Sequence, residues 1–114
     1  MRLKKAHKDQ NHDMIVEELE DLGYSVQSLH MVGGGVPDLI VGKSGETFLV
    51  ELKSETRQYN GKGYGYGVKG RLEDSQIAWI ERWQGGPVIV ACTTEEVLAG
   101  IEQQLDTTVR TAVN

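Results

Sequence analysis

Two segments rich in β-forming residues, separated by a glycine-containing turn, constrain the fold of this 114-residue chain more than any other feature. Residues 38–41 and 47–53 carry mostly branched or aromatic apolar side chains, and Ser44 and Gly45 lie between them. Such side chains favour strands, and a short turn with glycine between two such runs is typical of an antiparallel hairpin. The fold must therefore accommodate these two paired strands.

The turn fixes which hairpin residues face one another. We take Ser44 and Gly45 as the two turn residues. Asp38 then lies opposite Glu51, and Lys53 shares their face because strand side chains alternate. The apolar residues of both strands, Leu39, Val41, Phe48, Val50 and Leu52, point to the other face. A shift of one residue in the turn would separate the two carboxylates, so the pair is expected only in this register.

The rest of the chain supplies further elements at helical or strand spacing. The expected helices cover residues 9–22, 73 or 74 to 84, and 93 or 94 to 105, and the further strands cover 24–29 and 88–92. Three glycines at 33–35 predict a loop. The sequence therefore predicts one α/β domain over residues 1–114, with a mixed four-stranded sheet flanked by helices in the order α-β-β-β-α-β-α.

Packing expectations follow from the same patterns. Ile77, Ile80 and either Trp79 or Trp83 are expected to pack inward from the second helix. The continuous apolar run 88–92 is typical of a strand buried on both faces, and its Cys92 of a small core residue. Residues 106–114 are expected to fray. These features place the core between the sheet and its helices.

Charge and cysteine content limit the compartment and the partners. A net charge of −5 argues against non-specific coating of nucleic acid. The single cysteine cannot form a disulfide within the chain, and the basic N-terminal residues precede no apolar run. We therefore expect a cytoplasmic protein with no secretory signal and no membrane partner.

The expected carboxylate pair predicts a metal site. Neighbouring carboxylates repel each other, and proteins usually relieve this with a shared proton or a divalent cation. Oxygen ligands from Asp38, Glu51 and the Leu52 carbonyl suit Mg²⁺ or Mn²⁺. Lys53 beside such an ion would orient a water or stabilise charge on a phosphoryl group. The alternative interpretation is an ion-pair ladder on a sheet surface.

Residues 54–71 are rich in glycine and contain three tyrosines without an apolar period, which predicts a long, mobile loop. Basic and aromatic side chains alternate there, a combination suited to phosphate contacts and to stacking on unpaired bases. The candidate nucleic-acid contacts are Lys62, Tyr64, Tyr66, Lys69 and Arg71. An ordinary surface loop is an equal alternative.

The three histidines lack cysteine partners and the spacing of zinc ligands. His7, His12 and His30 are therefore expected on the surface or in satisfied hydrogen bonds rather than as metal ligands. His30 is close to the triple glycine and so lies near the expected site.

The segment Gly-Gly-Gly-Val-Pro-Asp38-Leu-Ile-Val-Gly, followed by Phe-Leu-Val-Glu51-Leu-Lys53, resembles the core of the PD-(D/E)xK nucleases. It is most similar to the small phage and bacterial proteins of the VRR-NUC type. The resemblance covers nearly the whole chain and implies a restriction-endonuclease-like core. It further implies that Asp38 and Glu51 bind metal, that Lys53 assists the attacking water and that Gln76 orients groups nearby.

An acid from the first helix is also usual in this family. Asp9, Asp13 and Glu17 share one helical stripe, so each is a candidate, and Asp13 is the first choice because it lies one turn before the apolar stripe deepens. The alternative for each of them is a solvated helix flank.

The resemblance implies a metal-dependent DNA endonuclease that leaves a 5′ phosphate. Stand-alone members of the family act as dimers on four-way junctions, which implies a homodimer acting on branched DNA. Two alternatives remain: a non-catalytic DNA-binding or partner-binding module on the same fold, and a subunit of a restriction system.

Overall fold

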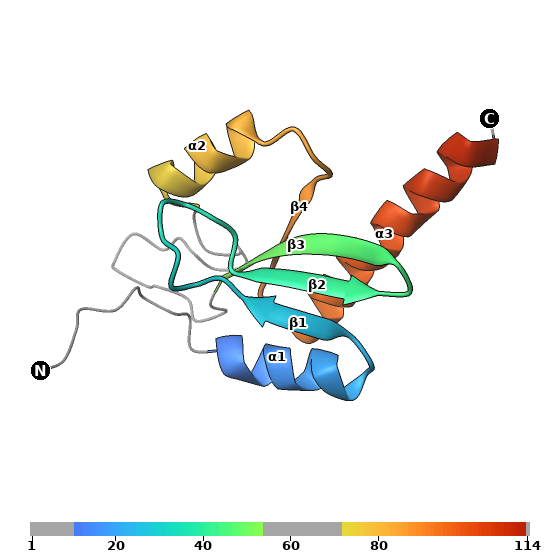
Figure 1. Cartoon of the computed structure of the whole chain (residues 1–114), viewed down its shortest axis with the longest axis horizontal. Helices are drawn as coiled ribbons and strands as arrows, with labels where there is room; N and C mark the ends of the chain where they lie inside the picture. Colours follow the sequence, from blue (N-terminus) through green and yellow to red (C-terminus); the bar gives the residue numbers. More distant parts are fainter. Residues whose placement is uncertain (1–10, 54–71, 114) are drawn as a thin grey trace, which may run out of the picture.

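The computed structural model describes residues 11–53 and 72–113 (Figure 1). Its elements in chain order are α1 (His12–Asp21), β1 (Ser25–Ser28), β2 (Leu39–Lys43), β3 (Glu46–Leu52), α2 (Asp74–Arg82), β4 (Val88–Ala91) and α3 (Thr94–Val113). The expected element order and the α/β class with a mixed four-stranded sheet are confirmed.

The four strands lie in the order β1-β2-β3-β4, with β1, β2 and β3 antiparallel and β4 parallel to β3. Lys43 pairs with Glu46, and Ile40 pairs with Leu49, so the predicted hairpin register is confirmed. Both turn residues have positive φ, 54° at Ser44 and 84° at Gly45. This is the signature of a type I′ turn, whose twist matches that of the flanking strands.

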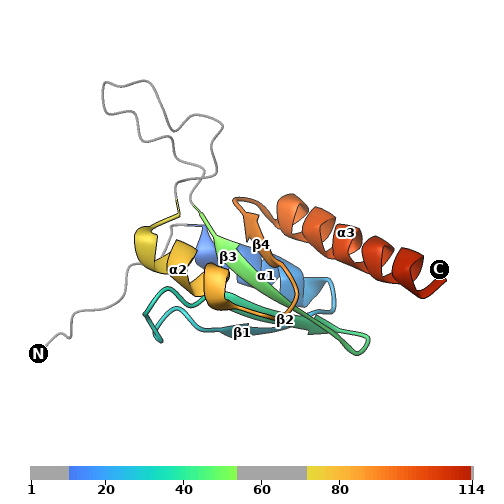
Figure 2. The same cartoon turned by 90° about the horizontal axis from the view of Figure 1, so that it is seen from above.

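One face of the sheet carries the hydrophobic core. The α1 and α3 helices pack on this face, and Figure 2 shows α3 on one side of β3 and α2 on the other. The core comprises Ile15, Leu19, Leu39, Val41, Phe48, Val50, Leu52, Ile89, Ala91, Val97 and Ile101. The hairpin residues expected to point away from the carboxylates all belong to it.

The second helix departs from the expected packing. No side chain of α2 is fully buried, and Ile77 and Trp83 are 40% and 42% exposed. The expectation that this helix sends Ile77 and a tryptophan into the core is wrong, although Trp79 and Ile80 are half-buried. The reason is that α2 lies on the face of the sheet opposite the core (Figure 2), and its Trp79 and Trp83 rings stack on each other at 4.9 Å.

The last strand and the last helix also differ from expectation. In β4 only Ile89 and Ala91 are buried, because this strand forms an edge of the sheet and Val88 and Val90 face the lightly covered side. Burial of β4 on both faces is therefore wrong. The third helix continues to Val113, beyond the expected end at residue 105, since no glycine or proline follows Gly100 to end it.

Among the described residues, no helix combines the length and the apolar character needed to cross a membrane. The predicted cytoplasmic location stays a prediction.

The glycine loop between β1 and β2 joins the strands to α2. Its base is closed by the Leu29 N–H, which donates to the Asp38 carbonyl at 2.7 Å. Gly33, Gly34 and Gly35 have φ values of 79°, 70° and 86°. A Cβ on Gly35 would lie 2.1 Å from the Ser75 carbonyl oxygen, so the loop backbone touches the first turn of α2. This close approach seats the start of α2 against the strands.

Candidate metal centre

The hairpin brings the two predicted carboxylates together. Asp38 directly precedes β2, and Glu51 lies one pair beyond Leu39–Val50 on β3. The Asp38 Oδ2 atom accepts a hydrogen bond from the Leu52 N–H at 2.8 Å, so its carboxylate reaches across to β3. The side chain of Glu51 is 97% buried. The pair is thus held by the backbone of two strands.

Lys53 and Gln76 complete a closed network with Glu51. The Lys53 Nζ lies 3.6 Å from Glu51 Oε2 and donates to Gln76 Oε1 at 2.9 Å. The Gln76 Nε2 in turn donates to Glu51 Oε2 at 2.7 Å. The structure therefore places three of the predicted site residues in mutual contact, with Asp38 beside them.

Gln76 also serves the helix that carries it. Its Oε1 atom accepts a hydrogen bond from the Glu73 N–H at 2.8 Å, as part of a capping box at the start of α2. In such a box the third helical residue satisfies the backbone donor of the N-cap. The same amide oxygen therefore stabilises the helix and holds the lysine.

These side chains border a polar cavity of about 240 Å³. Its lining comprises His30, Gly33, Gly34, Gly35, Val36, Asp38, Glu51, Leu52, Lys53, Glu73, Ser75 and Gln76. A larger cavity of about 630 Å³ lies between β4 and α3, but Glu96 is the one ionisable residue in its lining and accepts a hydrogen bond from the Cys92 N–H. The smaller cavity is therefore the one with a chemical cluster.

The environment of Glu51 opposes a second negative charge. Burial is the largest cause that raises the pKa of this carboxyl from its ordinary value of 4.5 to about 8, and the Asp38 charge raises it further. The Lys53 ammonium acts in the opposite direction without cancelling these effects. At neutral pH the pair therefore holds a proton that a cation would displace.

The donor set fits a hard divalent ion. Carboxylate oxygens and the Leu52 carbonyl are ligands that Mg²⁺ and Mn²⁺ prefer. In the described part of the chain, no three residues among histidine, cysteine, aspartate and glutamate gather into a full ligand set. Two carboxylates would leave further positions on such an ion for water, as is usual for Mg²⁺.

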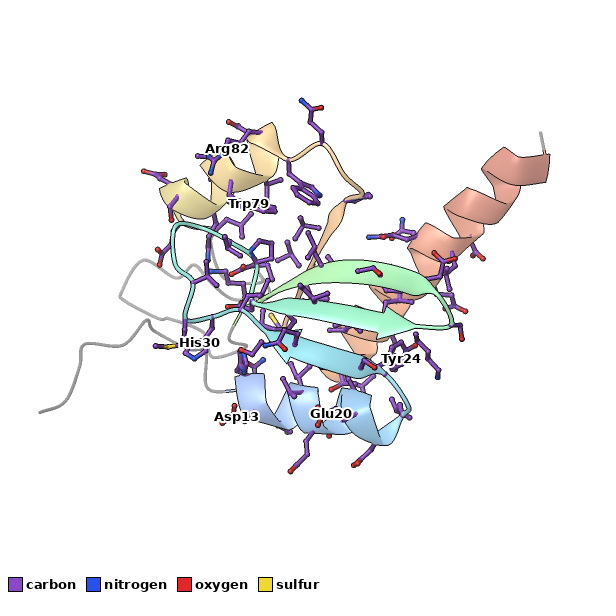
Figure 3. The ribbon with its side chains drawn as sticks, viewed as in Figure 1. Asp13, Glu20, Tyr24, His30, Trp79 and Arg82 are labelled. Carbon is purple, nitrogen blue, oxygen red and sulfur yellow. The ribbon has the colours of Figure 1, made fainter. Side chains whose placement is uncertain are left out.

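The first-helix acid is not part of this cavity. Asp13 has an 82% exposed side chain, lies 3.4 Å from the His12 Nδ1 atom and does not line the cavity (Figure 3). Glu17 is exposed and does not line it either, and Asp9 lies outside the described residues. Asp13 and Glu17 face solvent because the opposite face of α1, with Ile15 and Leu19, packs on the core.

The predicted nucleic-acid contacts lie outside the described residues. These are Lys62, Tyr64, Tyr66, Lys69 and Arg71. Their role stays a prediction.

The sequence did not predict that Asn11, His12 and His30 lie together near the site. The Asn11 side chain donates to the carbonyl oxygens of Lys53 and Cys92. His12 is 3% exposed, and its ring meets that of His30 edge to face at 5.5 Å. The expectation of surface or satisfied histidines is wrong for these two, because each has a buried Nδ1 atom without a hydrogen bond.

A signal for His12 was present in the sequence. His12, Ile15 and Leu19 recur at helical spacing, so His12 extends the apolar stripe by one turn toward the N-terminus. The prediction that His30 lies near the site is confirmed by its place in the cavity lining.

The chain matches no protein-family model, no curated protein sequence and no solved structure.

Proposed function

We propose that the chain is a metal-dependent DNA endonuclease with a restriction-endonuclease-like core. The single observation that carries the proposal is the buried network in which Asp38 adjoins Glu51 while Lys53 lies 3.6 Å from Glu51. Adjacent carboxylates can hold a divalent ion, and a lysine beside them can stabilise negative charge, and both contributions serve phosphodiester hydrolysis. The resemblance of these segments to the PD-(D/E)xK nucleases supports the same activity.

Each residue has a distinct task in this proposal. Asp38, Glu51 and the Leu52 carbonyl hold the ion, and Mg²⁺ or Mn²⁺ supplies Lewis-acid stabilisation of charge on the phosphoryl oxygens. The Lys53 ammonium orients the attacking water and stabilises developing negative charge. Gln76 fixes the Lys53 ammonium through its Oε1 atom, which limits the rotamers open to the lysine.

The bond changes follow from in-line attack. The oxygen of water forms a bond to phosphorus while the bond to the 3′ oxygen breaks. The 3′ oxygen leaves with a proton and the phosphate stays on the 5′ end. This is the outcome that the family resemblance implies.

The substrate proposed is branched DNA, including four-way junctions. The described residues form one small sheet with three helices around the candidate site, an arrangement that favours recognition of DNA shape over base sequence. Two symmetric incisions in a junction require two sites, and a homodimer supplies them. Light scattering tests this part: a dimer mass at micromolar concentration is expected, and a monomer mass would contradict it.

Cleavage of a panel of linear, flap, splayed and four-way DNA with Mg²⁺ or Mn²⁺ tests the activity. Wild type is expected to cut branched DNA, and the Asp38→Asn variant to cut none. Glu46→Gln is the matched control, because Glu46 is an exposed acid at the other end of the same hairpin. Binding of DNA without cleavage by wild type would favour a non-catalytic binding module instead.

A further inference from the structure

Two histidines border the site but have no part in the chemistry proposed above. His30 lines the cavity that contains Asp38, Glu51 and Lys53. His12 is buried behind it and meets its ring at 5.5 Å with an interplanar angle of 61°. Buried polar atoms usually have hydrogen-bond partners, so the two unpartnered Nδ1 atoms indicate a functional role.

Among the described residues that line the cavity, few side chains have a donor free for a phosphate. The Lys53 Nζ already donates to Gln76 and lies beside Glu51, and the Gln76 amide donates to Glu51. Three of the lining side chains are acids, whereas a bound phosphodiester needs donors for its non-bridging oxygens. Among the described lining residues, Ser75 and His30 also have side chains with a polar hydrogen, and the glycines at 33–35 add backbone N–H groups to the same cavity.

His30 is the more firmly held of these two. Its backbone N–H donates to the Ser28 Oγ atom at 3.5 Å, and its neighbour Leu29 pairs with Asp38. The ring rests edge to face on His12, whose Nε2 atom lies 3.4 Å from the same Ser28 hydroxyl. The ring contact with His12 and the backbone bond to Ser28 reduce the freedom that His30 would lose when it binds a ligand.

The hydrogen-bonding state of the ring agrees with a donor role. The buried Nδ1 of His30 has no hydrogen-bond partner. Nothing therefore holds the proton of the neutral ring on Nδ1, and the ring can carry it on Nε2 and donate from there. A buried nitrogen without a hydrogen bond destabilises the fold, and such groups are commonly retained at functional sites.

We propose that His30 is a substrate-contacting residue that donates from its imidazole to a phosphate oxygen of the strand bound in the cavity. His12 is a positioning residue that holds the His30 ring. This inference rests on the proposed nuclease function, and it adds a phosphate contact on the glycine-loop side of the site.

Kinetics of four variants test the proposal on the branched DNA that wild type cuts. We expect His30→Ala to lower kcat/KM about tenfold or more, and His30→Gln to restore part of it because glutamine keeps a donor. His12→Phe keeps the ring and loses both nitrogens, so it should raise KM more than it lowers kcat. Ser25→Ala, at an exposed position on β1, is the matched control and should match wild type.

Calorimetric Mn²⁺ affinity separates a phosphate contact from damage to the metal site. The Mn²⁺ affinity of His30→Ala should stay within about twofold of wild type, because this substitution is expected to impair DNA binding and turnover only. A kcat/KM of His30→Ala within about twofold of wild type, or a loss of Mn²⁺ binding equal to its loss of activity, would overturn the proposal.

A measurement without cleavage distinguishes failure of this inference from failure of the nuclease function. Imidazole nitrogen signals are recorded by ¹H–¹⁵N correlation NMR on the Asp38→Asn chain as a short single-stranded DNA is added. We expect the His30 imidazole signals to shift on addition of DNA, and the same His30 signals to shift by the same amount in a chain that also carries Ser25→Ala. Shifted signals in a chain whose wild type cuts nothing would uphold the contact and reject the nuclease. Unmoved His30 signals, whether or not wild type cuts, would reject the contact.

Discussion

Replacing Glu51 by glutamine should stabilise the metal-free protein at alkaline pH while removing its response to metal. The carboxyl of Glu51 is buried, beside Asp38, and its pKa is raised to about 8. The amide in Glu51→Gln still accepts the hydrogen bond from the Gln76 Nε2 atom and offers a donor toward Asp38. It therefore resembles the protonated acid without being able to ionise.

The expected size follows from the shift in pKa. A folded pKa of about 8 above the ordinary 4.5 means that the folded state binds the proton more tightly. The stability this proton contributes is fully present below pH 4.5 and is lost as the pH rises through 8. At 1.36 kcal/mol per pH unit, the loss is roughly 3 kcal/mol at pH 7 and roughly 4 kcal/mol at pH 8.

Urea unfolding in the presence of a chelator measures this loss, with Trp79 and Trp83 as fluorescent probes. We expect wild type and Glu51→Gln to have similar free energies of unfolding at pH 5. The variant should be more stable at pH 8 by roughly 2–4 kcal/mol. Added Mn²⁺ should raise the stability of wild type at pH 8 and leave the variant unchanged.

The control is Glu46→Gln, an exposed acid on the same strand, which should change stability by less than about 0.5 kcal/mol at either pH. Equal stability of wild type at pH 5 and pH 8, or a variant less stable than wild type at pH 8, would refute the reasoning. Such a result would mean that Glu51 is ionised in the folded protein without a cation.

Other substitutions test the remaining contacts of the site. Lys53→Met should keep the calorimetric Mn²⁺ affinity within a few fold of wild type. It should lower the single-turnover cleavage rate by about a hundredfold or more, because the lysine charge acts in the transition state. A cleavage rate within a few fold of wild type would show that the lysine is structural. Gly35→Ala should destabilise the fold by about 2 kcal/mol or more and impair cleavage, since its Cβ would collide with the Ser75 carbonyl. Gly34→Ala is the control, because Gly34 has a similar φ but open space around it, and this variant should lower the free energy of urea unfolding by about 1 kcal/mol. Gln76→Ala should lower the free energy of unfolding by about 1 kcal/mol, because the helix cap is lost, and should also slow cleavage, because Lys53 loses its acceptor. A variant that loses stability but cuts at the wild-type rate would show that Gln76 serves the helix alone.

The hairpin and its carboxylate pair could be predicted because their determinants are local. Ser44 and Gly45 accept positive φ, and the alternation around them fixes the register. Asp38 and Glu51 then have one relative position. Local sequence also located the Gln76 helix end, where Glu73 provides the N-cap.

What could not be predicted depends on how the elements pack. The spacing of Ile77 and Trp83 shows an apolar stripe but not which face of the sheet it meets, and α2 lies on the face opposite the core. The contact between His12 and His30 joins α1 to a loop beyond β1, and no local pattern encodes it. Asp13 shows the same limit, because a shared helical stripe does not say which side faces the cavity.

The double duty of Gln76 has a consequence for heat inactivation. The Gln76 Oε1 atom accepts hydrogen bonds from both the Glu73 N–H and the Lys53 Nζ. When the first turn of α2 unfolds, both hydrogen bonds are therefore lost together. Because α2 buries no side chain fully, this turn opens at a lower temperature than the core beneath the sheet. Catalytic competence would then fade while most of the molecule is still native, and directed evolution for heat-tolerant cutting would enrich changes around residues 72–76 before any in the core.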